Sequence, residues 1–358
     1  MTGRKKILFI LGTTLTVFFL YMALRKQDLS EMYRAIRDAH YIYLLPALIV
    51  FSGGYAVRTL RWQFLLNPVK PVRLRRLFPL LMIGFMANNI FPSRAGEVVR
   101  AYVTGRKEGI SKSATFATIV IERIFDGLIL VLFFALVLLV APLPTHLTAE
   151  KEGMVHDITR AATVTGIALT SALLFLIAVI VWRERSMTVF SRVIARLPGP
   201  SRDFADHVLR SVMTGLESLR RAKETFFIFL TSVLSWALEA ASYHFVLRAF
   251  DLHLAASVPI LLLSVVNLAT MVPSTPGYFG PFEFFGAGTL KFFGVDPETA
   301  LASVIVIHAL VYLPITLVGA LCVGREGLSW RELGTESADP EVGRPGGSRQ
   351  APDAQDKA

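Results

Sequence analysis

The stretch LFPLLMIGFMANNIFPSRAGEVVR, residues 77–100, joins a short apolar run to a polar turn. The apolar part, Leu77–Phe91, is shorter than the roughly 20 residues that a helix needs to cross a bilayer. Basic residues flank it on both sides: Arg73, Arg75 and Arg76 before it, and Arg94, Arg100, Arg106, Lys107 and Lys112 after it. Because Lys and Arg collect on the cytoplasmic side, both ends are predicted to lie there. The run is therefore predicted to enter the membrane and turn back.

The rest of the chain is equally apolar. Of its 358 residues, 53% are hydrophobic and only 18% are charged, against about 25% charged in soluble domains. This composition excludes a soluble enzyme and predicts a polytopic membrane protein. Six runs are long enough for full transmembrane helices: Ile7–Leu24, Tyr41–Val57, Phe116–Val140, Thr163–Trp182, Phe226–Phe250 and Leu301–Val323. The first is predicted to be retained rather than cleaved, because no small-residue cleavage site follows it.

A second short run, Val258–Val272, lies between two spans that leave and re-enter the cytoplasm. It is therefore predicted to dip into the membrane from the opposite face. The expected fold is an all-α polytopic membrane protein with about six full transmembrane helices and two re-entrant hairpins in an inverted-repeat arrangement, a recurring plan of transporters.

The two hairpin regions resemble each other in sequence. Each short run ends in Pro-Ser, continues into a turn with Gly and Glu, and reaches a glycine before the next span. The predicted repeats cover residues 41–140 and 226–323. Irregular backbone at membrane depth must be buried or line a polar cavity, so the turns are expected to line one. The turn residues concerned are Pro92, Gly96, Pro273, Pro276, Gly277 and Gly280.

The expected organisation is a membrane domain over residues 1–324, with an amphipathic cytoplasmic connector at 183–224, and a disordered cytoplasmic tail at 325–358. Both termini are predicted to be cytoplasmic, in a bacterial-type inner membrane. The sequence contains no Walker loop, HExxH, CxxC or GxSxG motif, and its single cysteine is Cys322. We expect no cofactor, no metal site and no nucleic-acid partner.

Ionisable residues inside spans are expensive and are candidates for function. Arg123 and Asp126 are three residues apart and are predicted to pair, which leaves Glu122 without a local partner. Its nearest cations are predicted to be Arg94 and Arg100. Two interpretations stay open: a functional ion network between turn and span, or a pair that merely holds helices together.

Four further positions are more ambiguous. Glu97 and Arg100 are either a functional pair or a pair at a helix end, and Glu239 is expected to face the cavity. Glu283 needs a partner among its aromatic neighbours, and His308 occupies the repeat position of Arg123. For the remaining polar candidates a structural role is favoured. His244 is expected to pack rather than to relay protons, and Arg58 and Arg61 mark the cytoplasmic end of a span or, alternatively, attract anionic headgroups.

The run Asn88–Asp126, with Pro-Ser-Arg-Ala-Gly-Glu and Glu-Arg-Ile-Phe-Asp, resembles the transmembrane region of lysylphosphatidylglycerol synthases, within the flippase-like membrane proteins. Residues 273–283 are similar to the second signature of that family. The resemblance covers about residues 7–323. It implies a lipid-translocating membrane region, which in two-part relatives accompanies a cytosolic domain that transfers lysine to phosphatidylglycerol. No such domain is expected here, and the resemblance implies Arg where this chain has His308.

The expected function is translocation of an anionic or aminoacylated phospholipid, or a polyprenyl-type lipid, between leaflets. Arg94, Arg100 and Arg123 are expected to bind the lipid phosphate, oriented by Glu97 and Glu122. Further substrate-binding candidates are Asp126, Glu239, Glu283 and His308. Three alternatives stay open: a non-transporting partner of a separate lipid-modifying or glycan-synthesising enzyme, the membrane half of a phosphatidylglycerol lysyltransferase system, and an enzyme using Glu97. A homo-oligomer is equally open.

Overall fold

The computed structural model describes residues 3–25, 27–91, 95–140, 182–196, 222–270 and 276–330, with a few positions beside them (171, 198–199, 202 and 332–333). Over these residues the chain is helical and contains no strand. The α-helices are α1 (Gly3–Leu24), α2 (Leu29–Asp38), α3 (Leu44–Leu66), α4 (Leu74–Ile90), α5 (Gly96–Glu108), α6 (Lys112–Val140), α8 (Arg183–Ile194), α10 (Ala222–Ala249), α11 (Ser257–Ala269), α12 (Pro281–Phe292) and α13 (Pro297–Arg325). Short 3₁₀ turns, η1 (Tyr41–Tyr43) and η5 (Pro276–Tyr278), precede α3 and α12.

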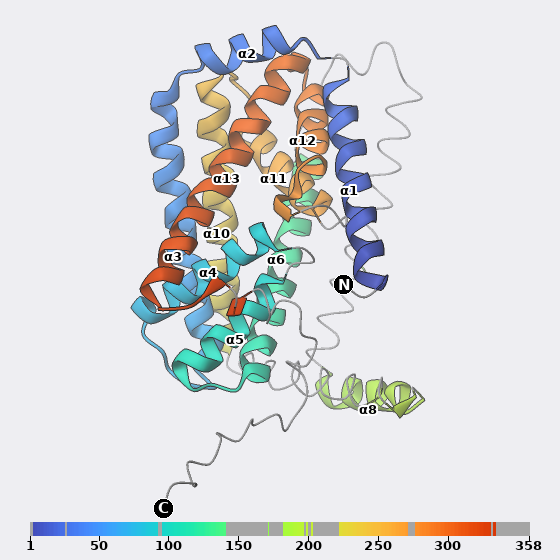
Figure 1. The fold of residues 1–358 in the computed structure, drawn as a ribbon, viewed down its shortest axis with the longest axis vertical. Coiled ribbons are helices and arrows are strands. Elements are labelled where there is room, and N and C mark those ends of the chain that lie inside the picture. The colour runs from blue at the N-terminus through green and yellow to red at the C-terminus, as the bar shows by residue number, and fades with distance from the viewer. Residues whose placement is uncertain are drawn as a thin grey trace, which may run out of the picture.

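Four long helices, α3, α6, α10 and α13, run along the bundle, and two pairs of short helices fill its opposite ends (Figure 1). The pair α4–α5 lies at the lower end of Figure 1, where α3 ends and α6 begins. The pair α11–α12 lies in the upper half, between α1 and α13. Both short apolar runs identified in the sequence are thus helices of fewer than 18 residues.

The first helix of each short pair packs against a long helix of the other half of the chain. α4 contacts α13, and α11 contacts α6, while α3 packs along α10. Within each half, the contacts between α4 and α5 and between α5 and α6 have counterparts between α11 and α12 and between α12 and α13. The two halves therefore interlock, and neither short pair is held only by its own half.

Glycines with positive φ end the second helix of each short pair at matching places. Gly109 (φ 64°) caps α5 in the left-handed conformation, and Gly294 (φ 81°) follows α12. This region of backbone space carries little penalty for glycine and a large one for other residues. The glycine that the sequence places before each following span is therefore the residue that stops the preceding helix.

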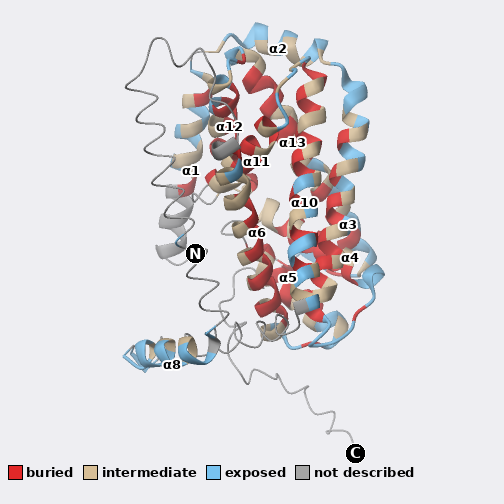
Figure 2. Ribbon diagram, turned by 180° about the vertical axis from the view of Figure 1, so that it is seen from behind, coloured by how far each residue is buried: buried red, intermediate tan, exposed pale blue. Residues whose placement is uncertain are grey.

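Two apolar cores lie one above the other. The lower core joins α3, α4, α5 and the end of α13, and the upper core joins α10, α11, α12 and the start of α13. Figure 2 shows the buried residues gathered on the inward faces of these helices, with α2 and α8 largely exposed. The cores differ in surroundings, because the lower core borders the buried charges described below.

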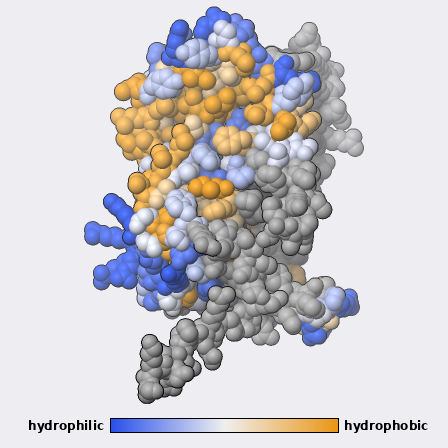
Figure 3. Space-filling model, in the orientation of Figure 1, coloured by the Kyte–Doolittle hydropathy of each residue, from blue (hydrophilic) through white to orange (hydrophobic). Residues whose placement is uncertain are grey.

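Three described helices are long and apolar enough to cross a membrane: Tyr41–Leu66, Lys223–Ala249 and Pro297–Arg325. Their outer faces are apolar, as on α13, where Leu313, Leu317 and Leu321 are all exposed. Figure 3 shows an apolar surface over the upper and middle bundle, with hydrophilic residues at both ends. The exposed basic residues of the lower end include Lys70, Arg73, Arg75, Arg76, Arg106 and Lys107. These three helices confirm three of the predicted spans, and the predicted span Thr163–Trp182 falls almost entirely outside the described residues.

The first residues of the predicted disordered tail are packed. Leu328 and Leu333 are buried in the lower core, and Glu332 pairs with Arg106 of α5 at 3.3 Å. Glu326 pairs with Lys107 at 3.2 Å. The expectation of disorder from residue 325 is therefore wrong for this short segment, because two leucines among polar residues reach the core.

The contact of α13 with α4 depends on Gly319. A Cβ at this position would lie 2.3 Å from Met86 Cβ and 2.8 Å from the Met82 carbonyl oxygen. We expect Gly319→Ala to lower the free energy of unfolding by about 1–3 kcal/mol, because the helices must separate. Gly324→Ala is the matched control, since nothing lies within 4 Å of its Cβ. Denaturant unfolding in detergent measures both, and equal stabilities of the two variants would contradict this packing.

Candidate functional site

The centre of the site is one turn of α6. Glu122 and Asp126 are four residues apart and lie on one face of the helix, with Arg123 beside them. Glu122 is fully buried and Asp126 nearly so. Two buried carboxylates on one face repel each other unless cations lie between them, so their partners must come from other helices.

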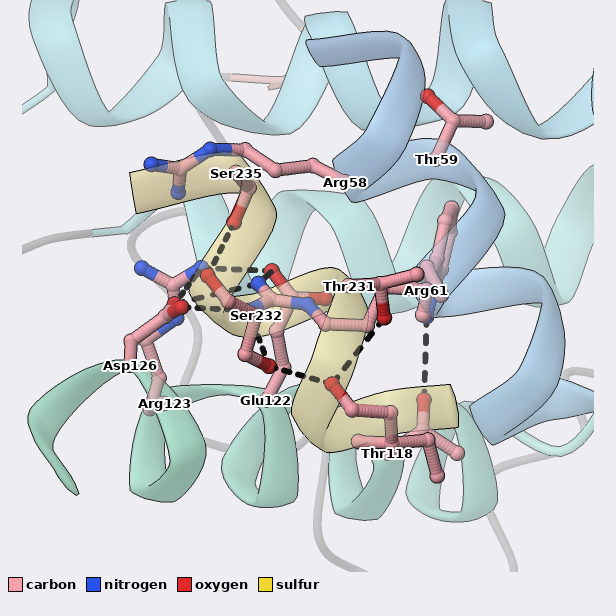
Figure 4. A network of polar contacts seen from close by, with 12 residues as sticks. Arg58, Thr59, Arg61, Thr118, Glu122, Arg123, Asp126, Thr231, Ser232 and Ser235 are labelled. Carbon is pink, nitrogen blue, oxygen red and sulfur yellow. Dashed lines mark hydrogen bonds and ion pairs between the residues drawn. The ribbon is translucent and has the colours of Figure 1, made fainter. Parts of the chain in front are cut away.

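The first partner is Arg61 of α3, which is also fully buried. Its Nη1 donates to Asp126 Oδ1 at 2.6 Å and to Ser232 Oγ of α10 at 3.0 Å, and its Nη2 lies 3.2 Å from Glu122 Oε1. Figure 4 shows α3, α6 and α10 converging on these groups. One guanidinium therefore bridges both carboxylates.

The second partner is Arg100 of α5. Its two terminal nitrogens donate to the two oxygens of Glu122 at 3.1 and 2.8 Å, the bidentate geometry that suits a carboxylate. The guanidinium carbon lies 3.7 Å from the centre of the Trp62 ring. The prediction that Arg100 pairs with Glu122 is confirmed, and the pair ties the first short helix pair to α6.

Arg123 is the most accessible arginine of the site. Its Nη2 lies 2.6 Å from Glu122 and 3.1 Å from Asp126, so the predicted pair with Asp126 is confirmed. The prediction that Glu122 has no local partner is wrong, because the neighbouring Arg123 folds back onto it. Glu97, at the start of α5, lies 3.9 Å from Arg123 Nε, and 29% of the Arg123 side chain remains exposed. Arg123 borders a small pocket lined by Gly84, Phe85, Asn88, Gly96, Glu97 and Arg100.

A further ion pair lies deeper along α3. Arg58 Nη2 donates to Glu239 Oε2 of α10 at 2.7 Å, and both side chains are nearly inaccessible. Trp236 lies beneath the Arg58 guanidinium, 4.4 Å from ring centre to carbon, and donates from its Nε1 to Asp126 at 2.9 Å. Glu239 is thus part of the same polar region, held by an arginine rather than facing an open cavity.

The interpretation of Arg58 and Arg61 as markers of a membrane boundary is wrong. It rested on ending the span at Val57, whereas α3 continues to Leu66 and carries both arginines into the bundle. Their spacing of three residues places them on neighbouring parts of one helix face. The available signal was the apolar sequence on both sides, Phe51–Val57 and Trp62–Leu66, which predicts that the helix continues.

The charges of this cluster balance formally, but its outer pair is loose. Three buried arginines (Arg58, Arg61 and Arg100) face three buried carboxylates (Glu122, Asp126 and Glu239), while Arg123 and Glu97 are both partly exposed, at 29% and 24% of their side chains, and lie 3.9 Å apart. The buried Nε atoms of Arg61, Arg100 and Arg123 have no hydrogen-bond partner. Arg123 therefore keeps an unused donor beside the pocket, where an anionic group would gain a charge-assisted hydrogen bond.

The second short helix pair repeats one element of this arrangement. Glu283 of α12 and His308 of α13 meet at 2.5 Å between Oε1 and Nδ1. In the first half, Glu97 and Arg123 occupy the same places: an acidic residue in the first turn of the second short helix, and a basic residue on the following long helix. Glu283 thus has the partner that its surroundings require.

The predicted site residues fall into two groups. Glu97, Arg100, Glu122, Arg123, Asp126 and Glu239 come together in one cluster, joined by Arg58 and Arg61, whereas Glu283 and His308 form a separate pair. The pair proposed between Glu97 and Arg100 does not form, because Arg100 is engaged by Glu122. Among the predicted turn residues, Gly96 lines the pocket, while Pro276, Gly277 and Gly280 lie next to the Glu283–His308 pair. Arg94, Pro92 and Pro273 lie outside the described residues.

Comparisons with known proteins agree with this architecture. The family model of the lysylphosphatidylglycerol synthase TM region matches residues 9–319. A UPF0104 membrane protein of Methanothermobacter thermautotrophicus is 28% identical, over 82% of this chain and 86% of its own. UPF0104 membrane protein MJ1595 of Methanocaldococcus jannaschii is 24% identical, over 82% and 88%.

A third relative is larger. Glycosyltransferase AglD of Haloferax volcanii is 25% identical over 88% of this chain, and the match spans 54% of AglD. The match of the family model covers all the described residues of the charged cluster and of the Glu283–His308 pair. The chain therefore belongs to the family of the lysylphosphatidylglycerol synthase transmembrane region.

Proposed function

We propose that this protein moves an anionic lipid between the leaflets of its membrane, with the lipid phosphate bound at Arg123. The observation that carries the proposal is the position of Arg123, a partly exposed arginine at the edge of a buried ionic cluster, whose outer carboxylate partner, Glu97, lies 3.9 Å away. Arginine suits phosphate because its planar guanidinium binds two oxygens at once. A phosphate bound beside Arg123 would form a close ion pair with its guanidinium, whereas Glu97, at 3.9 Å, forms only a weak one.

The fixed geometry of Arg123 supports this role. Glu122 and Asp126 hold its Nη2, so the guanidinium is oriented before a ligand arrives. The terminal nitrogens of Arg100 and Arg61 are engaged by carboxylates, and these two arginines act on the lipid through the field they add. The acyl chains remain in the bilayer, beside the apolar outer surfaces of the helices. Arg94, which precedes α5 in the sequence, is proposed as a second phosphate ligand.

We propose further that α4–α5 and α11–α12 are re-entrant hairpins of an inverted repeat. Their entry from opposite ends of the bundle and their exchange of contacts with the long helices support this topology. The exposed basic residues at the lower end support the assignment of that end to the cytoplasm. Both termini are then cytoplasmic. The Arg123 pocket lies near the tip of the first hairpin, between the last turns of α4 and the first turns of α5.

A second candidate function is the membrane half of a glycan- or lipid-modifying system that uses a separate enzyme. The observation that favours it is the match to AglD, which covers most of this chain but about half of AglD. In this alternative the charged cluster presents a lipid-linked substrate to the enzyme instead of carrying the lipid across. Both candidates require an anionic lipid at Arg123.

Reconstitution into liposomes with fluorescent phosphatidylglycerol tests the first candidate. Dithionite quenching measures how fast the labelled lipid exchanges between leaflets. We expect Arg123→Gln to slow the exchange at least about tenfold, since it removes a charge-assisted phosphate contact. The matched control is Arg34→Gln, because Arg34 is exposed on α2 and forms only a 3.7 Å pair with Glu31.

Two outcomes would contradict the proposal in different ways. An Arg123→Gln variant that is folded and as active as the unaltered protein would end the assignment of Arg123. Absence of exchange by the unaltered protein, together with retention of phosphatidylglycerol that depends on Arg123, would instead favour the second candidate.

A further inference from the structure

The Glu283–His308 pair differs chemically from its counterpart in the first half of the chain. Glu97 faces an arginine, which is always charged, whereas Glu283 faces a histidine, which gains and loses a proton near neutral pH. Both side chains of the pair are buried, at 5% and 6% exposure. The second half thus has a titratable group where the first half has a permanent charge.

The two polar atoms of the pair that do not face each other are engaged by the turn that precedes α12. His308 Nε2 lies 2.8 Å from the Gly277 carbonyl oxygen, and the Gly280 N–H donates to Glu283 Oε2 at 2.7 Å. The turn itself is tightly bent, with positive φ at Gly277, Tyr278 and Gly280. Residues 276–280 are therefore held against α13 by the same two side chains.

Hydrogen-bond chemistry fixes how many protons this arrangement needs. The Gly277 carbonyl only accepts, so His308 Nε2 must carry a proton. Between His308 Nδ1 and Glu283 Oε1, at 2.5 Å, a second proton must lie on one atom or the other, because two lone pairs at that distance repel. The intact pair holds two protons, and it is neutral overall whether the second sits on nitrogen or oxygen.

Loss of one proton to water leaves a single proton for two contacts. If it stays on Nε2, the Nδ1 lone pair faces the Glu283 carboxylate, and if it stays on Nδ1, the Nε2 lone pair faces the Gly277 carbonyl. In either case one contact is lost, and the turn loses part of its attachment to α13. The contact at stake is buried, where an unpaired polar group is costly.

The surroundings leave this proton without competition from another described charge. Phe282 stacks on the His308 ring with centroids 4.3 Å apart, and Phe279 lies at 4.8 Å. On α13 the neighbouring titratable group is Tyr312, with ring centroids 6.2 Å apart, and the turn contributes Tyr278. α1 brings Phe19 against α12, and α4 brings the uncharged Asn89, which donates to Thr316.

We propose that Glu283 and His308 form a single-proton site that latches the 276–280 turn to α13, so that opening of the second helix pair is linked to proton release and closing to proton uptake. The use of this site to drive lipid movement rests on the proposed function. The site itself does not, because it depends only on contacts within the chain.

Hydrogen–deuterium exchange of the purified full chain tests the latch without any transport measurement. The readout is the exchange rate of a peptide covering residues 276–285 relative to one within α3, which corrects for the chemical effect of pH on amide exchange. Between about pH 5.5 and about pH 8.5, a range in which histidine side chains ordinarily change charge, we expect this ratio to rise at least about fivefold. A ratio that stays constant over this range overturns the proposal.

The variant His308→Arg supplies the second test, since Arg123 occupies the corresponding place in the first half. An arginine can donate to both Glu283 and the Gly277 carbonyl at every pH in this range. We expect the ratio for His308→Arg to change less than about twofold, and a fivefold rise in this variant would also overturn the latch. If the variant does not fold, nitrogen NMR of the unaltered chain decides: a His308 ring that keeps one protonation state from about pH 5.5 to about pH 8.5 would refute the site. Normal lipid exchange without a pH-dependent latch would refute this inference alone.

Discussion

Glu122→Gln is expected to lower the free energy of unfolding by about 3–5 kcal/mol, because it removes the one carboxylate shared by three arginines. Glu122 is fully buried and lies 3.2, 2.8 and 2.6 Å from Arg61, Arg100 and Arg123. Glutamine keeps the shape but not the charge, so the cluster gains net positive charge where water cannot compensate it. Removing one partner of a buried ion pair costs far more than the pair contributes when intact.

Denaturant unfolding in detergent, followed by circular dichroism, measures this effect. The matched control is Glu31→Gln on α2, whose side chain is 56% exposed and forms a 3.7 Å pair with Arg34. Exposed pairs of this kind contribute less than about 1 kcal/mol. A Glu122→Gln variant that is no less stable than Glu31→Gln would show that the three arginines do not depend on Glu122.

The second large effect is expected at the buried ion pair between Arg58 of α3 and Glu239 of α10, whose nitrogen and oxygen atoms lie 2.7 Å apart. Glu239→Met leaves Arg58 without its carboxylate, and Arg58→Met leaves Glu239 without its cation, at a cost of about 3–5 kcal/mol each. The double variant Arg58→Met with Glu239→Met leaves no uncompensated charge and fills the same volume. We expect it to recover most of the stability, because apolar replacement of a buried pair is often neutral.

A double-mutant cycle measures this recovery directly. Four unfolding free energies, for the unaltered chain, the two single variants and the double variant, give the coupling between the two side chains. We expect a coupling of at least about 2 kcal/mol. If the two single losses simply add in the double variant, the side chains act independently and the pair between α3 and α10 is not a structural connection.

The two halves of the bundle are held together by different kinds of polar contact. In the first half, Arg100 of α5 pairs with Glu122 of α6, and Arg61 of α3 pairs with the same carboxylate. These ion pairs join helices that are distant in sequence. In the second half, a neutral pair with one shared proton holds a turn to α13. Under the proposed function, the first half binds the lipid phosphate and the second half responds to protons.

The sequence predicted much of the fold because the relevant signals are local. Run length and flanking charge identified α4 and α11 as short helices, since a helix needs a minimum number of apolar residues to span a bilayer. The sequence places Gly109 and Gly294 before the next long helices, and both have positive φ. Spacing along α6 predicted the pair of Arg123 with Asp126, because residues three apart on a helix are neighbours.

The sequence failed where a partner comes from another helix. Arg61 and Arg58 were interpreted as boundary residues, because nothing in the sequence of α3 shows that Asp126 of α6 and Glu239 of α10 lie opposite them. The sequence leaves two partners open for Arg100: Glu97, three residues away, and Glu122. The packing of α5 on α6 brings Arg100 into contact with Glu122. For the same reason Glu283 was recognised as needing a partner, but His308 could not be chosen.

By itself, the sequence determined that this chain is a helical membrane protein with two short helix pairs, since hydrophobicity, run length and glycine positions act within each segment. The tertiary structure alone decided which arginine meets which carboxylate and that Arg123 remains partly accessible. The physical reason is that an ion pair depends on atoms within about 4 Å. Helical register fixes the face on which a side chain lies, but only the packing of α3, α5, α6 and α10 brings those faces together.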